Sequence, residues 1–512
     1  MKRRLAIMGI AGLALIASAG AFAYEMRYPA TRWIAAADRG LFVLPPARHP
    51  YDLLDAFLRS ATEEIQANVS KAGGMQSSMT KRLPGLKIEA INTNNFGEVA
   101  DSTWFTNRIG RYGPKPCEVA KLMSGCTLDS AGPLVVREAS TGSNAPVLLV
   151  EDRAGARFIF ISDAADAPGK MSSPAAAASL ILSAAGYNAA LHCPAAIDRG
   201  ALSIADDSKL MGEYGKTGPL TADELTKLLE KQPQQMRGVA IRIPDGRPIG
   251  RFSFSKRPYG DKNDLMRHQD RRELRGLRIF SAFIGWVSIS ERTPYDTFVE
   301  AAGNAGYVEH WLLNLTEIAE PSQPFNPLGA GASGGNPAFA LMTPYDAFWA
   351  ARIVSLFSDQ MIDAIVAAAN YPDAGEAQKA VGGLKLRRDA LAKKWFGAMS
   401  PLDDFIISSA DGAMKVSCSD LVVIAQASDR RYRAELTTPY GRAIVVPWQE
   451  GSSCDFNLGD GAMKALADDG RVHELIVQAK DADDRWWLPP AKLFVEAKDG
   501  VPTIVGLGRR TY

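Results

Sequence analysis

The chain has 512 residues, of which 46% are hydrophobic and 22% are charged, and its 58 basic and 57 acidic residues leave a formal net charge of +1. This composition is that of a globular protein of about three domains. A balanced charge gives no electrostatic reason to bind nucleic acid or an acidic membrane surface, so we expect neither as a partner.

The first 23 residues have the pattern of a secretory signal peptide. Basic residues at positions 2–4 precede an apolar stretch from Leu5 to Ala19, and Ala21-Phe22-Ala23 places small residues where signal peptidase recognises them. We therefore expect cleavage after Ala23 and a periplasmic or secreted protein without a membrane span. The alternative is a retained anchor, because residues 5–23 are barely long enough to cross a bilayer.

Residues 24–132 form a predicted N-terminal extension. Apolar residues at helical spacing predict an amphipathic helix over residues 52–71. The segment Asp101-Ser-Thr-Trp-Phe-Thr-Asn-Arg108 follows, and a loop region rich in glycine and proline comes after it.

Residues 133–255 are expected to be rich in strands. Short apolar runs at 134–138, 146–152 and 157–162, separated by small-residue turns, predict a β-meander. A helix over 174–185 is expected to end at Gly186, and Thr221 with Glu224 forms a capping box for a second helix. Runs at 239–243 and 251–255 around Pro244-Asp245-Gly246 predict a hairpin.

Residues 256–405 are predicted to be mainly helical, with helices over 271–289, 346–369 and 376–396. Short strands with turn signals follow and predict a sandwich-like all-β domain over residues 406–512. The expected class is therefore α+β. A β-meander, one helix and then a helical lobe is the order of a two-lobed protein-kinase-like fold.

The chain has five cysteines and none of them form a Cys-x-x-Cys pair, so zinc and redox motifs are not indicated. In an oxidising compartment disulfides are expected, and Cys418–Cys454 is the favoured pair. For Cys117–Cys126, a disulfide and two small buried thiols remain open alternatives. Cys193 would be left over.

Several segments resemble a poorly characterised bacterial family with a kinase-like fold distantly related to HipA-type kinases. The resemblance covers about residues 92–405 and rests most on Trp-Phe-Thr-Asn-Arg at 104–108 and Arg-Arg-Glu-Leu-Arg-Gly at 271–276. It implies a β-rich lobe over 133–255 and a helical lobe over 256–405. The tail after 406 adds nothing to it.

The family has a strand lysine, a helix glutamate, an Asn-His-x-Asp loop with a downstream asparagine, and an Asp-Phe-Gly sequence. Together these groups would hold the nucleotide phosphates, Mg²⁺ and the acceptor hydroxyl. The corresponding positions here are Ile161, Ala175, Trp286-Val287-Ser288, Thr293 and Asn314. No acid lies between Ala282 and Ser290, so a shifted alignment does not restore the loop. We therefore expect no catalytic residue, no cofactor and no metal site.

The favoured hypothesis is an exported, catalytically inactive kinase-like protein, a pseudokinase that binds an unknown envelope protein or acts as a scaffold. One alternative is an extracytoplasmic enzyme that re-uses the interlobe cleft, with His268, Asp296 or Glu317 in catalysis. Another is a structural envelope protein acting through residues 411–512. For Arg271, Arg272 and Arg275, salt bridges with Asp270 and Glu273 are favoured over anion binding.

Overall fold

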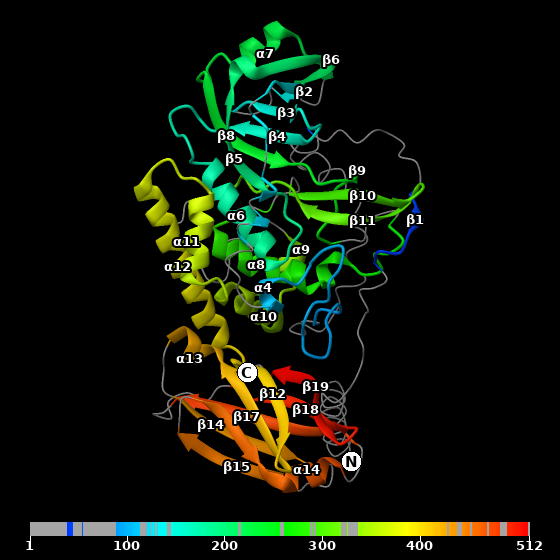
Figure 1. Ribbon diagram of the computed structural model, residues 1–512, viewed down its shortest axis with the longest axis vertical. Coiled ribbons are helices and arrows are strands. Elements are labelled where there is room, and N and C mark those ends of the chain that lie inside the picture. Colours follow the sequence, from blue (N-terminus) through cyan, green and yellow to red (C-terminus); the bar gives the residue numbers. More distant parts are fainter. Residues whose placement is uncertain are drawn as a thin grey trace, which may run out of the picture. The chain divides into compact units, whose positions relative to one another are not determined.

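The protein is described from a computed structural model. It describes residues 38–44, 54, 89–112, 119, 121–122, 124–126, 128–130, 132–140, 145–212, 217–255, 261–286, 289, 293–318, 325, 336–426, 430–437, 443–450, 453–467, 471–481 and 489–509. These belong to two compact units, a larger one drawn from residues 35–91 and 99–395 and a smaller one drawn from 92–98 and 396–512. The protein is a mixed α+β structure with several sheets (Figure 1).

A seven-stranded sheet with the order β5-β8-β4-β3-β2-β6-β7 forms one part of the larger unit. Its strands and the helices between them are β2 Leu134–Ser140, β3 Val147–Glu151, β4 Arg157–Ser162, α6 Ser172–Ala185, β5 His192–Asp198, β6 Leu202–Met211, β7 Thr217–Pro219, α7 Ala222–Leu228 and β8 Gln235–Arg242. Strands β2, β3 and β4 pair antiparallel in sequence order, so the predicted meander is confirmed.

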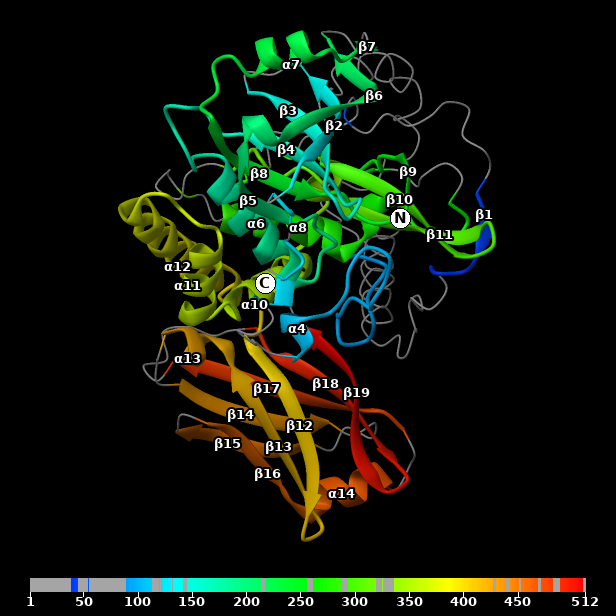
Figure 2. The ribbon, with the colours of Figure 1, turned by 45° about the horizontal axis from the view of Figure 1, so that its top comes forward.

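Every residue of β4 from Phe158 to Ile161 is apolar, and both faces of the strand are buried. Ile159 and Ile161 belong to one hydrophobic cluster, and Phe158 and Phe160 belong to the cluster on the opposite face. Helix α7 covers the second face and lies beside β6 (Figures 1 and 2). Its predicted capping box is present, with Thr221 and Glu224 bonded to each other's backbone.

A four-stranded sheet with the order β1-β11-β10-β9 also belongs to the larger unit. Its strands are β1 Phe42–Val43, β9 Arg247–Gly250, β10 Pro294–Ala302 and β11 Ala305–Leu312. Strands β10 and β11 form a hairpin closed by the two residues Gly303 and Asn304, with φ of 59° at Gly303. This hairpin lies in the stretch that was predicted to be helical.

The helices of the larger unit are α4 Ile109–Tyr112, α8 Arg272–Ile284, α9 Pro337–Ala340, α10 Pro344–Ser355, α11 Asp359–Ala368 and α12 Ala374–Phe396, with a 3₁₀ helix at His268–Asp270 and another at Arg199–Ala201. Helix α8 packs against α10, and the absence of a side chain at Gly276 makes room for Trp349, which a Cβ would meet at 2.9 Å. Helix α11 packs against α6. Within the described residues, no helix has the length and apolar character needed to cross a bilayer.

Two further predicted elements are wrong. The runs at 239–243 and 251–255 do not form a hairpin, because residues 251–255 form no strand. The strand that follows Pro244-Asp245-Gly246 is β9, which pairs with β10 in the other sheet and not with β8. The single helix predicted over 346–369 is two helices, because Ser358 caps a new helix by accepting a hydrogen bond from Met361 N.

The smaller unit contains a three-stranded sheet with the order β12-β13-β16 and a five-stranded sheet with the order β15-β14-β17-β18-β19. Its elements are β12 Leu402–Ala410, β13 Ala413–Asp420, α13 Leu421–Gln426, β14 Arg430–Thr437, β15 Ala443–Glu450, β16 Cys454–Leu458, α14 Gly459–Ala467, β17 His473–Asp481, β18 Ala491–Lys498 and β19 Val501–Arg509. Both sheets contribute to one hydrophobic core, in which Val416 and Phe456 from the first meet Tyr432 and Leu493 from the second.

The structure contains two cysteine pairs at disulfide distance. Cys418 lies opposite Cys454 on β13 and β16 with the Cα atoms 5.2 Å apart, as the sequence predicts. Cys126 pairs with Cys193 on β5, with the Cα atoms 5.3 Å apart. The predicted alternative Cys117–Cys126 is therefore wrong, because the fold places Cys126 beside a cysteine 67 residues away. Cys117 itself lies outside the described residues.

Candidate functional site

Ile161, the residue that the resemblance aligns with a strand lysine, lies near the end of β4, the third strand of the meander. Its side chain is 8% exposed and belongs to a hydrophobic cluster that includes Val147, Val239 and Leu313. No ammonium group is present at this position to hold a phosphate, and the cluster around it is apolar.

Leu54, from the N-terminal extension, completes this cluster. It is helical, fully buried and packed with the same set of side chains as Ile161. The remaining residues of the predicted helix 52–71 lie outside the described part of the chain. The sheet face that carries Ile161 is thus covered by apolar side chains from the protein itself. Sequence reasoning did not assign Leu54 any role, because its amphipathic pattern does not say what the apolar side covers.

Helix α6 carries Ala175, which the resemblance aligns with a helix acid. All fourteen side chains of α6 are buried, and its sequence SSPAAAASLILSAA contains no charged residue. A shift of the alignment along this helix therefore does not restore a carboxylate. Ser172 at its start is held by Asp163, which accepts hydrogen bonds from Ser172 N at 3.0 Å and from Ser172 Oγ at 2.7 Å.

Thr293 and Asn314 are brought together at the open end of the β10–β11 hairpin. Thr293 Oγ1 donates to the backbone oxygen of Asn314 at 3.4 Å, and Leu313 N donates to Thr293 O at 2.7 Å. The Asn314 side chain accepts from Thr316 N at 3.0 Å and from Thr316 Oγ1 at 2.7 Å. Its carbonyl oxygen is therefore used within the turn. Of the loop residues, Trp286 is buried, while Val287 and Ser288 lie outside the described residues.

A buried histidine fixes the backbone next to Asn314. His192 Nε2 accepts a hydrogen bond from Leu315 N at 3.2 Å, and His192 Nδ1 lies 2.8 Å from Ala190 O. Burial lowers the pKa of His192 to about 4. A neutral ring that donates from Nδ1 and accepts at Nε2 satisfies both contacts.

A second group of polar residues surrounds Trp104 from the Trp-Phe-Thr-Asn-Arg segment. We call it the Trp104 cluster; it consists of Trp104, Asp261, Asp264, His268, Arg271, Asp296 and His310. The His310 ring stacks on Trp104 with the ring centroids 3.8 Å apart, and the Arg271 guanidinium carbon lies 4.8 Å from the Trp104 ring centroid. The Trp104 ring thus has cationic groups near it.

Carboxylates contact the basic side chains of this cluster. His268 Nε2 and Arg271 Nη2 contact the two oxygens of Asp264 at 2.5 and 2.6 Å. Burial alone would raise the pKa of Asp264, but the His268 hydrogen bond and the Arg271 charge hold it well below its usual range. Burial alone would lower the pKa of His310. The carboxylates of Asp296, 2.7 Å from His310 Nδ1, and of Asp261 instead raise this pKa to about 9.

The Trp104 cluster brings together His268 and Asp296, two of the three residues suggested for a re-used cleft. Trp104, His268, Arg271 and His310 are each at most 4% exposed. A substrate has no direct access to such closed, mutually paired groups, so the arrangement supports a structural role for them. Glu317 lies after β11 and does not belong to the Trp104 cluster as defined above.

The three arginines at the start of α8 all form ion pairs, and Arg271 and Arg275 pair with the predicted acids. Arg275 Nη2 lies 3.0 Å from Asp270, and Arg271 Nη1 lies 3.5 Å from Glu273. Asp346 of α10, for which the sequence contains no local signal, lies 3.0 Å from Arg272 Nε and 3.5 Å from Arg275 Nη1.

His310 was also missed, although a signal for it existed. The Gly303-Asn304 turn is a common two-residue hairpin signal, and a hairpin closed there brings Asp296 close to His310. The two residues lie directly opposite each other because the register shifts by one residue between Glu300 and Ala302. Across the described ranges, no group of three or more His, Cys, Asp or Glu side chains is arranged to hold a metal ion.

Comparison with known proteins gives little further information. No protein-family model and no curated protein matches the chain. A solved structure described as the crystal structure of the Golgi casein kinase aligns with 72% of this chain and 95% of that chain, at 11% identity and a TM-score of 0.28. A TM-score this low does not establish a shared fold.

Proposed function

We propose that this chain is a kinase-like scaffold that has lost phosphoryl transfer and acts by binding another protein of the cell envelope. The order of the β2–β3–β4 meander followed by α6 supports the kinase-like assignment, because a protein kinase carries its lysine on the third strand and the partner acid on the following helix. The observation that carries the proposal is the burial of Ile161 beside Leu54 in an apolar cluster.

Phosphoryl transfer depends almost entirely on positioned charge around the γ-phosphate. The face of β4 that would hold a nucleotide presents Ile159 and Ile161, and helix α6 has no carboxylate. Magnesium needs oxygen ligands, and carboxylates are its usual protein ligands. Asn314 is uncharged, and its side-chain oxygen already accepts two hydrogen bonds from Thr316.

The envelope location is part of the same proposal. The signal-peptide pattern of residues 1–23 supports it, although those residues lie outside the described structure. Two cysteine pairs at disulfide distance are compatible with an oxidising compartment.

The test uses the purified, oxidised protein with Mg·ATP. We expect neither autophosphorylation nor ATP hydrolysis above a protein-free blank. Asn314→Ala is compared with the control Asn336→Ala. The Asn336 side chain also accepts a backbone hydrogen bond, from Ala338 N at 3.0 Å, but it lies at the start of α9 and away from the aligned kinase positions. ATP turnover that Asn314→Ala abolishes and Asn336→Ala preserves would show that the chain is a working enzyme and that the proposal is wrong.

A further inference from the structure

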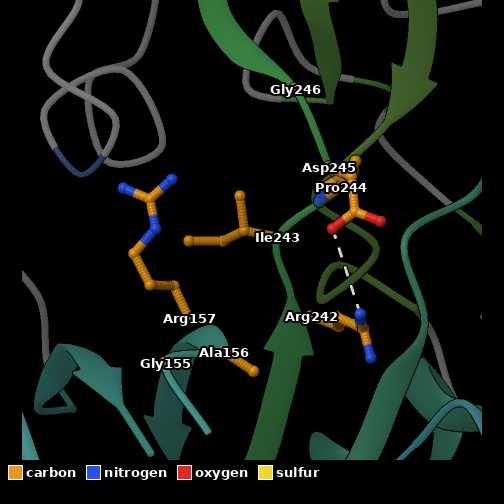
Figure 3. Close-up of a pocket in the computed structure, with 8 residues that line it drawn as sticks. All are labelled: Gly155, Ala156, Arg157, Arg242, Ile243, Pro244, Asp245 and Gly246. Carbon is orange, nitrogen blue, oxygen red and sulfur yellow. Dashed lines mark ion pairs between the residues drawn. The ribbon is translucent and has the colours of Figure 1, made fainter. Parts of the chain in front are cut away.

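A small pocket lies where the chain leaves the seven-stranded sheet after β8 (Figure 3). Its volume is about 170 Å³, and it is bounded by the β3–β4 turn at Gly155, by Arg157, and by the β8–β9 turn from Arg242 to Gly246. The pocket is separate from the Trp104 cluster and from Asn314, because it shares no lining residue with either.

The walls of the pocket are built by two tight turns. Gly155 and Gly246 have φ values of 77° and 104°, which residues with a side chain rarely adopt. Asp152 Oδ1 accepts hydrogen bonds from Ala154 N and Ala156 N, each at 2.9 Å, and fixes the first turn. The space between the turns is therefore present before any ligand arrives.

The pocket has an excess of positive charge. Arg157 is exposed and forms no ion pair with any residue that the structure describes. Arg242 Nη2 lies 3.9 Å from Asp245 Oδ1, and the Asp245 side chain is 93% exposed, so this pair is weak. Figure 3 shows Arg157 on one side of Ile243 and the Arg242–Asp245 pair on the other. Two guanidinium groups against one carboxylate leave a net charge of +1 in the lining.

We propose that this pocket binds a small oxyanion, a carboxylate or a phosphate group, with Arg157 as its main ligand. A guanidinium group presents a planar pair of N–H donors that matches both anions. Pockets for drug-sized ligands have volumes of about 300–1,000 Å³, so a pocket of 170 Å³ fits one anionic group with a few attached atoms and not a nucleotide. Ile243 and Pro244 supply apolar wall for those atoms.

The test is titration calorimetry of the purified full chain with inorganic phosphate and, separately, with succinate, against sodium chloride of equal ionic strength. We expect saturable binding with a dissociation constant in the millimolar range, and the tighter of the two probes identifies the anion class. Arg157→Gln should weaken binding at least tenfold, because it removes a charge-assisted pair of hydrogen bonds. Asp245→Asn should strengthen it, because it removes the only carboxylate of the lining.

Arg153→Gln is the matched control. Arg153 lies in the same β3–β4 turn, and its replacement by glutamine removes the same charge as Arg157→Gln. Arg153 pairs with Asp129 at 2.6 Å, however, and does not line the pocket. This variant should bind as the wild type does. Absence of saturable binding by the wild type, equal binding by Arg157→Gln, or an equal loss in Arg153→Gln would each overturn the proposal. These outcomes are independent of ATP turnover, so they do not bear on the proposed loss of phosphoryl transfer.

Discussion

Two buried histidines with opposite pKa shifts should set the pH dependence of stability. His192 has a pKa lowered to about 4, so between pH 4 and the usual histidine pKa of 6.5 the unfolded chain binds more protons than the folded chain. The stability that His192 contributes is therefore complete above pH 6.5 and is lost as the pH falls to 4. His310 has a pKa raised to about 9, so its contribution is complete below pH 6.5 and is lost as the pH rises through 9.

The magnitude follows from the size of the shifts. A pKa that moves from 6.5 to about 4 corresponds to about 3 kcal/mol. The structural cause is the ring nitrogen Nε2 of His192, which accepts a hydrogen bond from Leu315 N and cannot do so once it is protonated. The pKa of His310 shifts in the opposite direction, because the ring lies between Asp296 and Asp261, which favour its charged form.

The measurement is urea denaturation of the wild type, His192→Gln and His310→Gln between pH 4 and pH 9. Glu89 and Glu309 have pKa values raised by burial and also titrate in acid, so each variant is compared with the wild type at every pH. His192→Gln should flatten the loss of stability below pH 6.5, and His310→Gln should flatten the loss above it. An unchanged acid limb in His192→Gln would refute the neutral, hydrogen-bonded ring described above.

Three further predictions address the disulfide, the seven-stranded sheet and the N-terminus. Replacing Cys418 and Cys454 by serine should lower the stability of the smaller unit by about 3–4 kcal/mol on the chain-entropy model, measured by urea denaturation with and without reductant; equal stability would argue against the bond. Gly238→Ala should prevent stable folding, because the added Cβ would lie 2.1 Å from a backbone oxygen of β4. The control Gly382→Ala places its Cβ in open space on α12 and should be neutral or stabilising by up to about 1 kcal/mol. Thermal unfolding of both variants measures the difference. Mass spectrometry of the native protein should find an N-terminus at or near Tyr24; an intact Met1 in envelope fractions would contradict cleavage.

Elements with strong local signals could be predicted from the sequence. The meander strands follow from short apolar runs between turn residues, and the helix at Ala222–Leu228 follows from its capping box. The β10–β11 hairpin was missed because Asp296, Glu300 and His310 interrupt its apolar pattern. In the structure those charged residues are accommodated by partners such as the Asp296–His310 pair, which exists only once the hairpin forms.

The pairings that link distant parts of the chain could not be predicted locally. Cys126 meets Cys193 because β5 returns to the sheet after α6, and no spacing rule records that return. The pairing of Arg272 with Asp346 depends in the same way on the packing of α8 against α10. An apolar residue at position 161 can be read from the sequence, but the burial of Leu54 in the same cluster requires the folded structure.

The burial of Ile161 makes a lysine at this position unfavourable. Ile161→Lys would place an ammonium group among Val147, Val239 and Leu54, and α6 has no acid to pair with it. An uncompensated buried charge of this kind costs about 3–5 kcal/mol, so we expect a large loss of stability and no gain in Mg·ATP affinity. Ile406→Lys is the matched control, because Ile406 is 64% exposed and should change stability by less than about 0.5 kcal/mol. Urea denaturation and ATP titration of both variants test this, and an Ile161→Lys variant that is as stable as the wild type and binds Mg·ATP would show that the face of β4 is still an open nucleotide site.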